Sequence, residues 1–276
     1  MKYTKYLVIL AVCLIAAAAY SIVFDPVEKI VMEQDPMHQT SMEAAEETVE
    51  TEPSSRELSQ ILLEEEAPCI VLLGDSITAG VGSSDYKPDG QLVIQKSYDE
   101  KEYDTYRNTG AMSWAARFEV YMESTYPGCT VINNGVPGFT VWQLWDSVDS
   151  LIPEGCDVAI IQIGTNSRNA EDKQLLIVDP LEDLIEYLSN KGIVPVVMTT
   201  TVLLDQESPN DEYTVRQHIQ LACANRGIEC FDVLGEMEWQ LREEELDKST
   251  IMTDALHPND HGHEMIFNIY RSLLCV

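Results

Sequence analysis

The chain has 276 residues, of which 45% are hydrophobic and 23% charged, so it can bury a full core, and this composition excludes an intrinsically disordered protein. Its formal net charge is −30, from 17 basic and 47 acidic residues. Because so negative a chain repels a phosphate backbone, we expect no nucleic acid partner.

Residues 1–24 differ in kind from the rest of the chain. Lys2 and Lys5 precede residues 6–24, YLVILAVCLIAAAAYSIVF, an uncharged run long enough to cross a bilayer as a helix. We predict an N-terminal transmembrane helix with the lysines inside. A cleaved signal peptide is the alternative, and a lipoprotein signal ending at Cys13 is a weaker one. Each interpretation places the remainder of the chain outside the cytoplasm.

Residues 25–66 have the composition of a solvated spacer. The segment carries 13 acidic and 2 basic residues and few aromatic ones. We therefore predict an acidic, disordered linker. Removing this linker (−11) and the leader (+2) from the total of −30 leaves −21 for residues 67–276, so the predicted folded domain is itself acidic.

Seven cysteines lie at positions 13, 69, 129, 156, 223, 230 and 275. Their spacing is not typical of a zinc site, and several lie in apolar, strand-like segments, so we expect buried free thiols. A disulfide between Cys223 and Cys230 is the alternative in an oxidising compartment.

Residues 67–276 alternate between two hydrophobic periodicities. Apolar runs rich in β-branched residues predict strands at 69–74, 129–133, 157–164, 193–201 and 228–233, and helical spacing predicts helices at 111–126, 140–151, 171–190, 211–226 and 260–274. This alternation implies an α/β domain with three layers, in which helices cover both faces of a mostly parallel sheet of about five strands. Ligands of such sheets bind at the carboxyl ends of the strands.

Polar residues cluster at strand ends of the predicted sheet. They occur as GDS at 74–76, NNGVPGFT at 133–140, GTNS at 164–167 and, near the C-terminus, DALHPNDHGH at 254–263. Taken singly, each stretch is equally well explained as a turn or a cap. Their order and their common place on one sheet edge favour a single site.

With these four blocks in this order, residues 67–276 resemble the SGNH (GDSL-type) hydrolases, a family of esterases, lipases, thioesterases and carbohydrate acetylesterases. The resemblance implies a flavodoxin-like α/β/α fold, and it carries over five site residues: Ser76, Gly138, Asn166, Asp254 and His257. The third block of the family often reads Gly-Thr-Asn-Asp, whereas Ser167 stands here in place of the final aspartate. This departure bears on the hydrogen bonds around the site rather than on Asn166.

The chemistry of ester hydrolysis accounts for these residue types. A serine hydroxyl becomes a nucleophile when a base takes its proton, and the base needs a group that fixes its tautomer. Ser76 suits the nucleophile, His257 the base, and Asp254 the group that fixes the tautomer. The oxyanion would accept hydrogen bonds from the backbone N–H groups of Ser76 and Gly138 and from the Asn166 amide. We therefore predict a serine ester hydrolase (EC 3.1.-.-) that forms an acyl-enzyme on Ser76.

Two other assignments of these residues are less favoured. The nucleophile stretch is not a G-x-S-x-G elbow, because Thr78 stands where the second glycine would be, and this disfavours the larger α/β-hydrolase fold. The C-terminal histidines could be drawn with Asp254 as a zinc cluster, but they do not share one helical face. We expect His261 and His263 to be surface residues at the start of the last helix, and we expect no metal or other cofactor.

A polar insertion after the nucleophile suggests the substrate. Residues 82–109 are rich in tyrosine and lie where loops usually shape binding, although a mobile surface loop is the alternative. Tyrosines suit stacking on sugars, and no extended apolar surface for a long acyl chain is evident. We therefore expect a short-acyl, acetyl-type ester on a carbohydrate. Trp142 and Trp145 either line the same cleft or pack the following helix.

Two classes of function follow from the sequence. The first is a serine esterase outside the cytoplasm, anchored in the cell membrane or secreted, with lipase or thioesterase activity as an alternative. The second is a non-catalytic glycan-binding module on the same fold. Intact Ser76, Asn166, Asp254 and His257 favour the enzyme, because binding alone needs no triad. The expected partners are a small ester or an acylated carbohydrate and, through the N-terminal helix, the membrane; no obligatory protein partner is evident.

Overall fold

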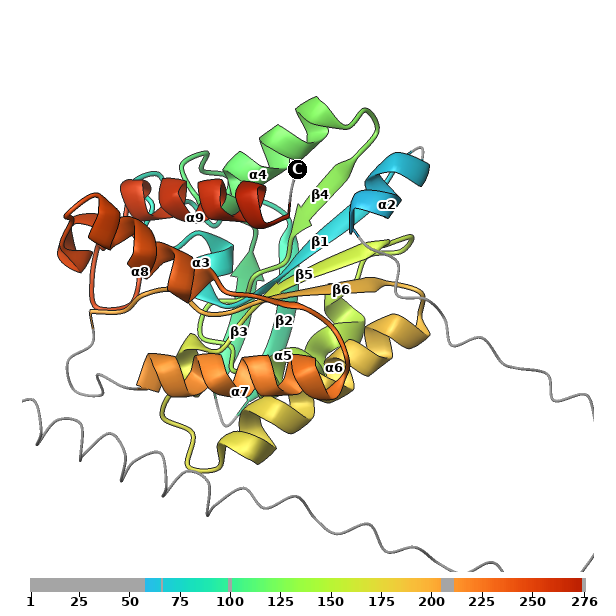
Figure 1. Ribbon diagram of the computed structural model, residues 1–276. Helices are drawn as coiled ribbons and strands as arrows, with labels where there is room; N and C mark the ends of the chain where they lie inside the picture. Colours follow the sequence, from blue (N-terminus) through green and yellow to red (C-terminus); the bar gives the residue numbers. More distant parts are fainter. Residues whose placement is uncertain (1–57, 66, 99–100, 205–210, 275–276) are drawn as a thin grey trace, which may run out of the picture. The chain divides into compact units, whose positions relative to one another are not determined.

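The computed structural model describes residues 58–65, 67–98, 101–204 and 211–274 (Figure 1). The transmembrane helix predicted within residues 6–24, and most of the linker predicted for residues 25–66, lie outside these ranges. Among the described residues, no helix is both long enough and apolar enough to cross a bilayer.

Five parallel strands form the central sheet in the order β4-β1-β5-β6-β7. The strands are β1 (Cys69–Gly74), β4 (Thr130–Asn133), β5 (Val158–Gln162), β6 (Val194–Met198) and β7 (Cys230–Phe231). The central strands are apolar along their length because helices cover both faces of the sheet. The chain adds β4 on one side of β1 and then β5, β6 and β7 on the other side. The carboxyl ends of β1 and β5 therefore form the switch point where ligands of such sheets bind.

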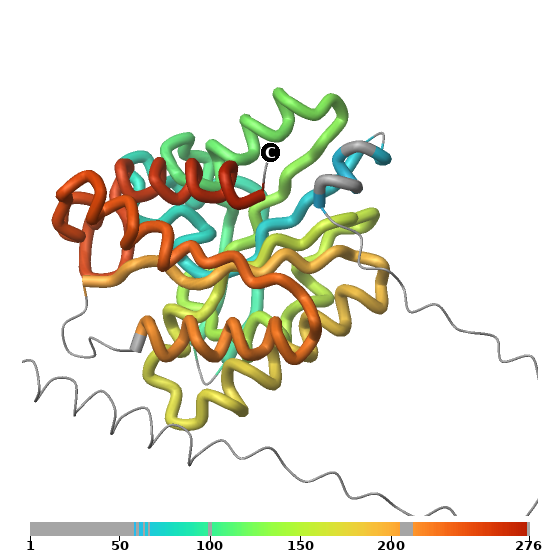
Figure 2. The backbone as a smooth tube through the Cα atoms, in the orientation of Figure 1, coloured from blue at the N-terminus to red at the C-terminus, as the bar shows by residue number. Residues whose placement is uncertain are grey.

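Two helical layers cover the sheet (Figures 1 and 2). One layer holds α2 (Leu58–Glu64), α4 (Trp114–Thr125), α8 (Val233–Glu243) and α9 (Asp260–Leu273), and the other holds α5 (Val141–Leu151), α6 (Asp179–Asn190) and α7 (Asp211–Asn225). Alternate residues of β1 face opposite layers: Ile70 and Leu72 pack in the first, Val71 and Leu73 in the second. The predicted α/β/α fold with a parallel five-stranded sheet is confirmed.

Helix α2 lies inside the segment that we predicted as a linker. Leu58, Ile61 and Leu62 recur with helical spacing and are buried in the first core layer. Within the described residues, the core of the domain therefore includes these three side chains from the segment that we predicted as a linker.

The insertion at 82–109 contains an antiparallel hairpin of β2 (Leu92–Tyr98) and β3 (Lys101–Tyr106). The hairpin lies against α5, where the Lys96 ammonium binds the Asp146 carboxylate at 2.8 Å and the Tyr98 hydroxyl lies 2.6 Å from Ser147 Oγ. Most of the described insertion is thus folded structure that packs on the sheet domain, rather than a mobile loop.

Candidate active site

Ser76 lies at the carboxyl end of β1 and is the first residue of the short helix α3 (Ser76–Ala79). Asp75 caps this helix, since its carboxylate accepts a hydrogen bond of 3.0 Å from the Ile77 N–H. The Thr78 hydroxyl donates to the Gln162 carbonyl at the end of β5 at 3.2 Å. These two bonds fix Ser76 at the switch point between β1 and β5.

The Asp75 carboxyl is buried beneath the serine. Burial raises the pKa of Asp75 to about 6, although the hydrogen bond from Ile77, the nearby His257 and the hydrogen bonds with Thr165 each lower it. From the sequence we expected Asp75 only to form a turn. The role of Asp75 as the cap of α3 could have been inferred, because its carboxylate comes directly before a serine at the end of an apolar strand.

A chain of hydrogen bonds joins Ser76 to Asp254 through His257. His257 Nε2 lies 3.0 Å from Ser76 Oγ, and His257 Nδ1 lies 2.8 Å from Asp254 Oδ2. With Nδ1–H donating to the carboxylate, the Nε2 lone pair faces the serine hydroxyl, which is the tautomer that a general base needs. His257 can therefore take the proton of the Ser76 hydroxyl, and Asp254 can stabilise the imidazolium that results.

Asp254 is kept ionised by its hydrogen bonds. Partial burial acts to raise the pKa of Asp254, but the hydrogen bond from the His257 side chain and those from the N–H groups of Leu256 and His257, at 2.8 Å each, together lower it. An ionised carboxylate at this place favours the charged form of the imidazole next to it.

The loop that carries His257 is fixed on both sides. The Thr253 hydroxyl donates to the Gly82 carbonyl at 2.8 Å, and the Thr253 N–H donates to the His257 carbonyl at 2.8 Å. Asn259 then caps α9 and donates its amide to the Thr250 carbonyl at 3.0 Å. These contacts hold the imidazole over Ser76 although the two residues are 181 positions apart in sequence.

The loop after β4 brings Gly138 to the same edge of the sheet. The Val136 N–H donates to the Gly74 carbonyl at 2.9 Å, and the Asn133 amide donates to the Thr78 carbonyl at 2.8 Å, so this loop is bound to the nucleophile turn. Gly138 has φ +87°, a conformation that favours glycine. Within the described part of the chain, neither the Ser76 N–H nor the Gly138 N–H donates to a protein acceptor.

Asn166 lies in a 3-10 helix, Thr165–Ser167, directly after β5. Its Nδ2 donates to the Phe139 carbonyl at 3.0 Å, which links it to the residue after Gly138 and leaves the second amide hydrogen for another acceptor. The Ser167 hydroxyl accepts a hydrogen bond of 3.1 Å from the Val141 N–H at the start of α5. The serine that departs from the family pattern thus binds the loop after β5 to α5.

The structure corrects the expectation for His263. Its side chain is 0% exposed: Nδ1 accepts a hydrogen bond from the Trp114 N–H at 3.4 Å, and Nε2 lies 3.2 Å from the Val81 carbonyl. Burial lowers the pKa of His263 to about 4, so it is a neutral core residue. His261 is exposed, as expected. Among the described residues, no three histidine, cysteine or carboxylate side chains converge as metal ligands.

Aromatic side chains extend from the Gly138 loop to the hairpin. The Tyr98 ring lies edge-on to Phe139 at 5.9 Å and to Trp142 at 5.7 Å between centroids, and Trp142 remains 43% exposed. Trp145 packs instead against Tyr187 of α6 at 5.7 Å. Of the two tryptophans, Trp142 is therefore the one that presents an open aromatic surface next to the site.

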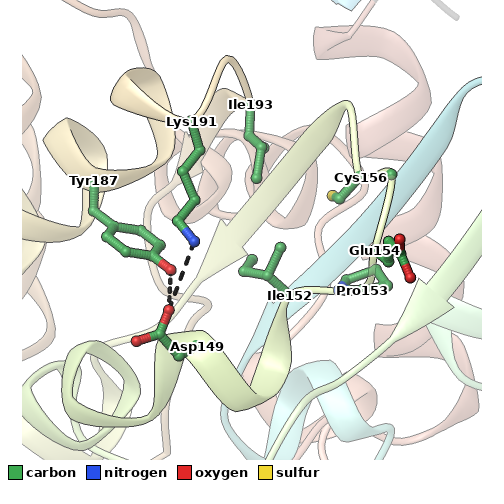
Figure 3. A pocket seen from close by; sticks show the side chains of 9 residues that line it. Asp149, Ile152, Pro153, Glu154, Cys156, Tyr187, Lys191 and Ile193 are labelled. Carbon is green, nitrogen blue, oxygen red and sulfur yellow. Dashed lines mark hydrogen bonds and ion pairs between the residues drawn. The ribbon is translucent and has the colours of Figure 1, made fainter.

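A pocket of about 470 Å³ lies elsewhere, between the C-terminal ends of α5 and α6 (Figure 3). Its lining residues include Asp149, Cys156 and Lys191. Cys156 precedes β5, whereas the residues around Ser76 follow the strands, so the pocket opens at the opposite edge of the sheet. It is separate from the hydrogen-bonded chain of Ser76, His257 and Asp254.

Comparison with known proteins agrees with this description. The model of the GDSL-like lipase/acylhydrolase family matches residues 72–265. No curated protein sequence matches the chain significantly.

Several solved structures are similar in fold. An α/β hydrolase enzyme from the metagenome of Lake Arreo, Spain, is 16% identical, with a TM-score of 0.56 over 76% of this chain and 96% of that one. The acetylxylan esterase Axe2 of Geobacillus stearothermophilus is 15% identical, with a TM-score of 0.56 over 76% and 94%. A two-domain esterase active on acetylated mannans is 18% identical, with a TM-score of 0.55 over 76% and 48%. At these identities the likeness shows the shared fold alone.

Proposed function

The chain belongs to the GDSL-like lipase/acylhydrolase family and is a serine ester hydrolase, and on this premise we propose that it removes short acyl groups, acetyl above all, from carbohydrates. The observation that carries the hydrolytic part is the hydrogen-bonded chain from Ser76 Oγ through His257 to Asp254. The preference for a short acyl group on a sugar rests on the exposed Trp142 and its neighbour Tyr98.

In the first half of the proposed reaction, Ser76 Oγ attacks the ester carbonyl carbon while His257 Nε2 takes the hydroxyl proton. The carbonyl oxygen becomes an oxyanion, which accepts hydrogen bonds from the N–H groups of Ser76 and Gly138 and from the Asn166 amide. His257 then returns the proton to the sugar oxygen, which leaves as an alcohol. The acyl group stays on Ser76.

In the second half, water replaces the sugar. His257 takes a proton from the water as the water oxygen bonds to the acyl carbon. Collapse of the second oxyanion breaks the bond to Ser76 Oγ, His257 returns the proton to this oxygen, and the carboxylic acid leaves. Asp254 stabilises the imidazolium in both halves.

Support for the carbohydrate comes from the aromatic surface beside the site. Tyrosine and tryptophan faces combine an apolar body with a polar edge and stack well on sugar rings. Two proteins of the same fold are named as esterases of acetylated xylan and acetylated mannans. We carry this substrate class to the present chain as a proposal.

We also propose that the catalytic domain works outside the cytoplasm, anchored by the helix predicted within residues 6–24 or secreted after its removal. Lys2, Lys5 and the uncharged run support this location. The test is fractionation of cells that express the full chain, followed by protease treatment of intact cells. Membrane-bound protein whose domain the protease releases would support the anchor, and full-length protein in the cytosol would contradict it.

The substrate is tested with nitrophenyl esters of increasing acyl length and with acetylated xylo-oligosaccharides. We expect the highest kcat/KM for acetyl esters. We also expect Trp142→Ala to raise KM for the oligosaccharide about fivefold while leaving nitrophenyl acetate nearly unchanged, since one stacking contact contributes about 1 kcal/mol. Trp239→Ala is the matched control, because Trp239 is 51% exposed on α8 in the other helical layer.

Two outcomes would contradict the proposal. A rate that rises with acyl length to eight carbons and beyond would make the protein a lipase or thioesterase. A folded protein that binds the oligosaccharide but hydrolyses no ester would be a glycan-binding module.

A further inference from the structure

The hairpin brings a lysine to the edge of the predicted oxyanion hole. A Cβ atom placed on Gly138 would lie 3.1 Å from Lys101 Nζ and 3.6 Å from a ring carbon of Tyr103. Lys101 is the first residue of β3, and Gly138 belongs to the loop after β4. The approach of Lys101 to Gly138 therefore depends on the hairpin, which lies beside α5 (Figure 1).

The charge of Lys101 is not cancelled by a carboxylate among the described residues. Its ammonium lies over the Tyr103 ring, 4.7 Å from the centroid. By contrast, Lys96 of the same hairpin binds Asp146, and Lys191 binds Asp149. Among the described residues, the Lys101 ammonium therefore lies beside the Gly138 loop without a carboxylate bound to it.

The ring beneath the ammonium is held firmly. Tyr103 is buried, its ring packs edge-on to Phe139 at 5.0 Å, and its hydroxyl accepts a hydrogen bond of 3.4 Å from the Gln143 amide. Phe139 directly follows Gly138. The cation–π contact thus fixes the end of the Lys101 side chain relative to the loop that carries the glycine.

We propose that Lys101 is a further residue of the reaction, whose ammonium stabilises the oxyanion that accepts the hydrogen bond from the Gly138 N–H. The inference rests on the proposed function, in which Gly138 lines the oxyanion hole. Lys101 Nζ lies 3.1 Å from the place that a Cβ on Gly138 would occupy, so the ammonium is no more than about 8 Å from an oxygen bound to that N–H. A unit charge at this distance from developing negative charge lowers the barrier even when solvent screens it.

The effect should be smaller than that of a buried donor, because Lys101 is exposed. Removing an enclosed oxyanion donor costs about 10² to 10³ in turnover. For Lys101 we expect a loss of about tenfold, which is about 1.4 kcal/mol.

The test uses Lys101→Met, which keeps the length of the side chain without its charge, and Lys101→Arg, which keeps the charge. Wild type and variants are compared on nitrophenyl acetate, a neutral ester, and in the rate at which a fluorophosphonate labels Ser76. We expect Lys101→Met to lower kcat about tenfold with KM within twofold, and to slow labelling by a similar factor. Lys101→Arg should retain most of the activity.

Two controls separate charge from structure. Lys191→Met removes the same charge at the opposite edge of the sheet and should leave kcat unchanged. Tyr103→Leu removes the ring under the ammonium and should lower kcat in part. Circular dichroism melts of every variant show whether the fold is kept.

The outcomes distinguish this inference from the proposed function. If wild type hydrolyses acetate and Lys101→Met does so equally fast, the inference is wrong and the esterase stands. If Lys101→Met raises only KM, and only for anionic esters, Lys101 is a substrate contact and the inference is also wrong. If wild type hydrolyses no ester and resists the fluorophosphonate, the proposed function itself fails.

Discussion

Gly82 packs directly against His257. A Cβ atom on Gly82 would lie 2.9 Å from the His257 Cβ and 2.2 Å from the Pro258 carbonyl oxygen, and Gly82 has φ +98°. No side chain fits there unless the loop that carries the proposed base moves.

We therefore predict that Gly82→Ala lowers kcat about 10- to 100-fold, because a displacement of His257 by even 1 Å disturbs proton transfer from Ser76. The control is Gly155→Ala, at φ +72° with nothing within 4 Å of its Cβ. This control carries similar backbone strain and should lose about 1 kcal/mol of unfolding free energy but no activity. Equal activity of the two variants would show that Gly82 does not position His257.

Ser76→Ala should abolish both ester hydrolysis and fluorophosphonate labelling. The loss should exceed about 10³-fold, because no other group supplies the attacking oxygen. Ser83→Ala is the control, since the Ser83 hydroxyl donates to the Gly80 carbonyl at 2.9 Å on the same segment. Mass spectrometry of the labelled peptide identifies the modified residue, and a label on any serine other than Ser76 would refute the assignment.

Asn166→Ala should lower kcat about 10² to 10³-fold and change KM by no more than a few fold, as for other oxyanion donors. Asn166→Asp should be at least as damaging, because an ionised carboxylate donates no hydrogen bond and repels the oxyanion. The hydrogen bond from Asn166 to the Phe139 carbonyl adds a structural role, so melting temperatures accompany the kinetics. A variant that raised KM alone would make Asn166 a ground-state contact.

Asp75→Asn should change how stability depends on pH. The pKa of Asp75 rises from 3.8 to about 6 in the fold, so the native state holds this proton more tightly than the unfolded chain. Its contribution is fully present below pH 3.8 and is lost as the pH rises through 6, in total about 3 kcal/mol. On acidification from pH 6.5 to 4, the variant should therefore lose more stability than wild type in urea titrations. Parallel curves would contradict the burial effect.

His263→Gln should change the dependence of stability on pH in the opposite direction. The pKa of His263 falls from 6.5 to about 4 in the fold, so the stability of the neutral form is present above pH 6.5 and is lost as the pH falls through 4, by about 3 kcal/mol. The variant should be less sensitive to acid than wild type, whatever its stability at neutral pH. A curve for the variant that stayed parallel to that of wild type would contradict the burial effect at His263.

The sheet could be predicted from the sequence because its strands are buried on both faces. The apolar run at 69–74 matches β1, and the other four runs each contain a strand. Helix α8 went unpredicted although Val233, Leu234, Met237 and Leu241 have helical spacing after the capping Asp232. The hairpin was harder, because few of its residues are buried and they are covered by the Gly138 loop rather than by sequence neighbours.

That Ser76, Asp254 and His257 lie close together could be inferred from the order of the four polar blocks, since each block follows a strand or precedes the last helix. The burial of His263 could also have been predicted from the hydrophobic periodicity, because Ile266 and Tyr270 follow it at helical spacing on the buried face of α9. The contacts of Gly82 and Lys101 could not be predicted, because they depend on how separate loops fold back on one another.

The distance in sequence between Ser76 and His257 has a consequence for biosynthesis. The nucleophile is made first, and its base follows 181 positions later, on a loop whose position depends on α9. A nascent chain, or one clipped before residue 257, therefore carries the serine without the means to activate it. Esterase activity therefore requires that synthesis has passed α9, which places His257 over Ser76.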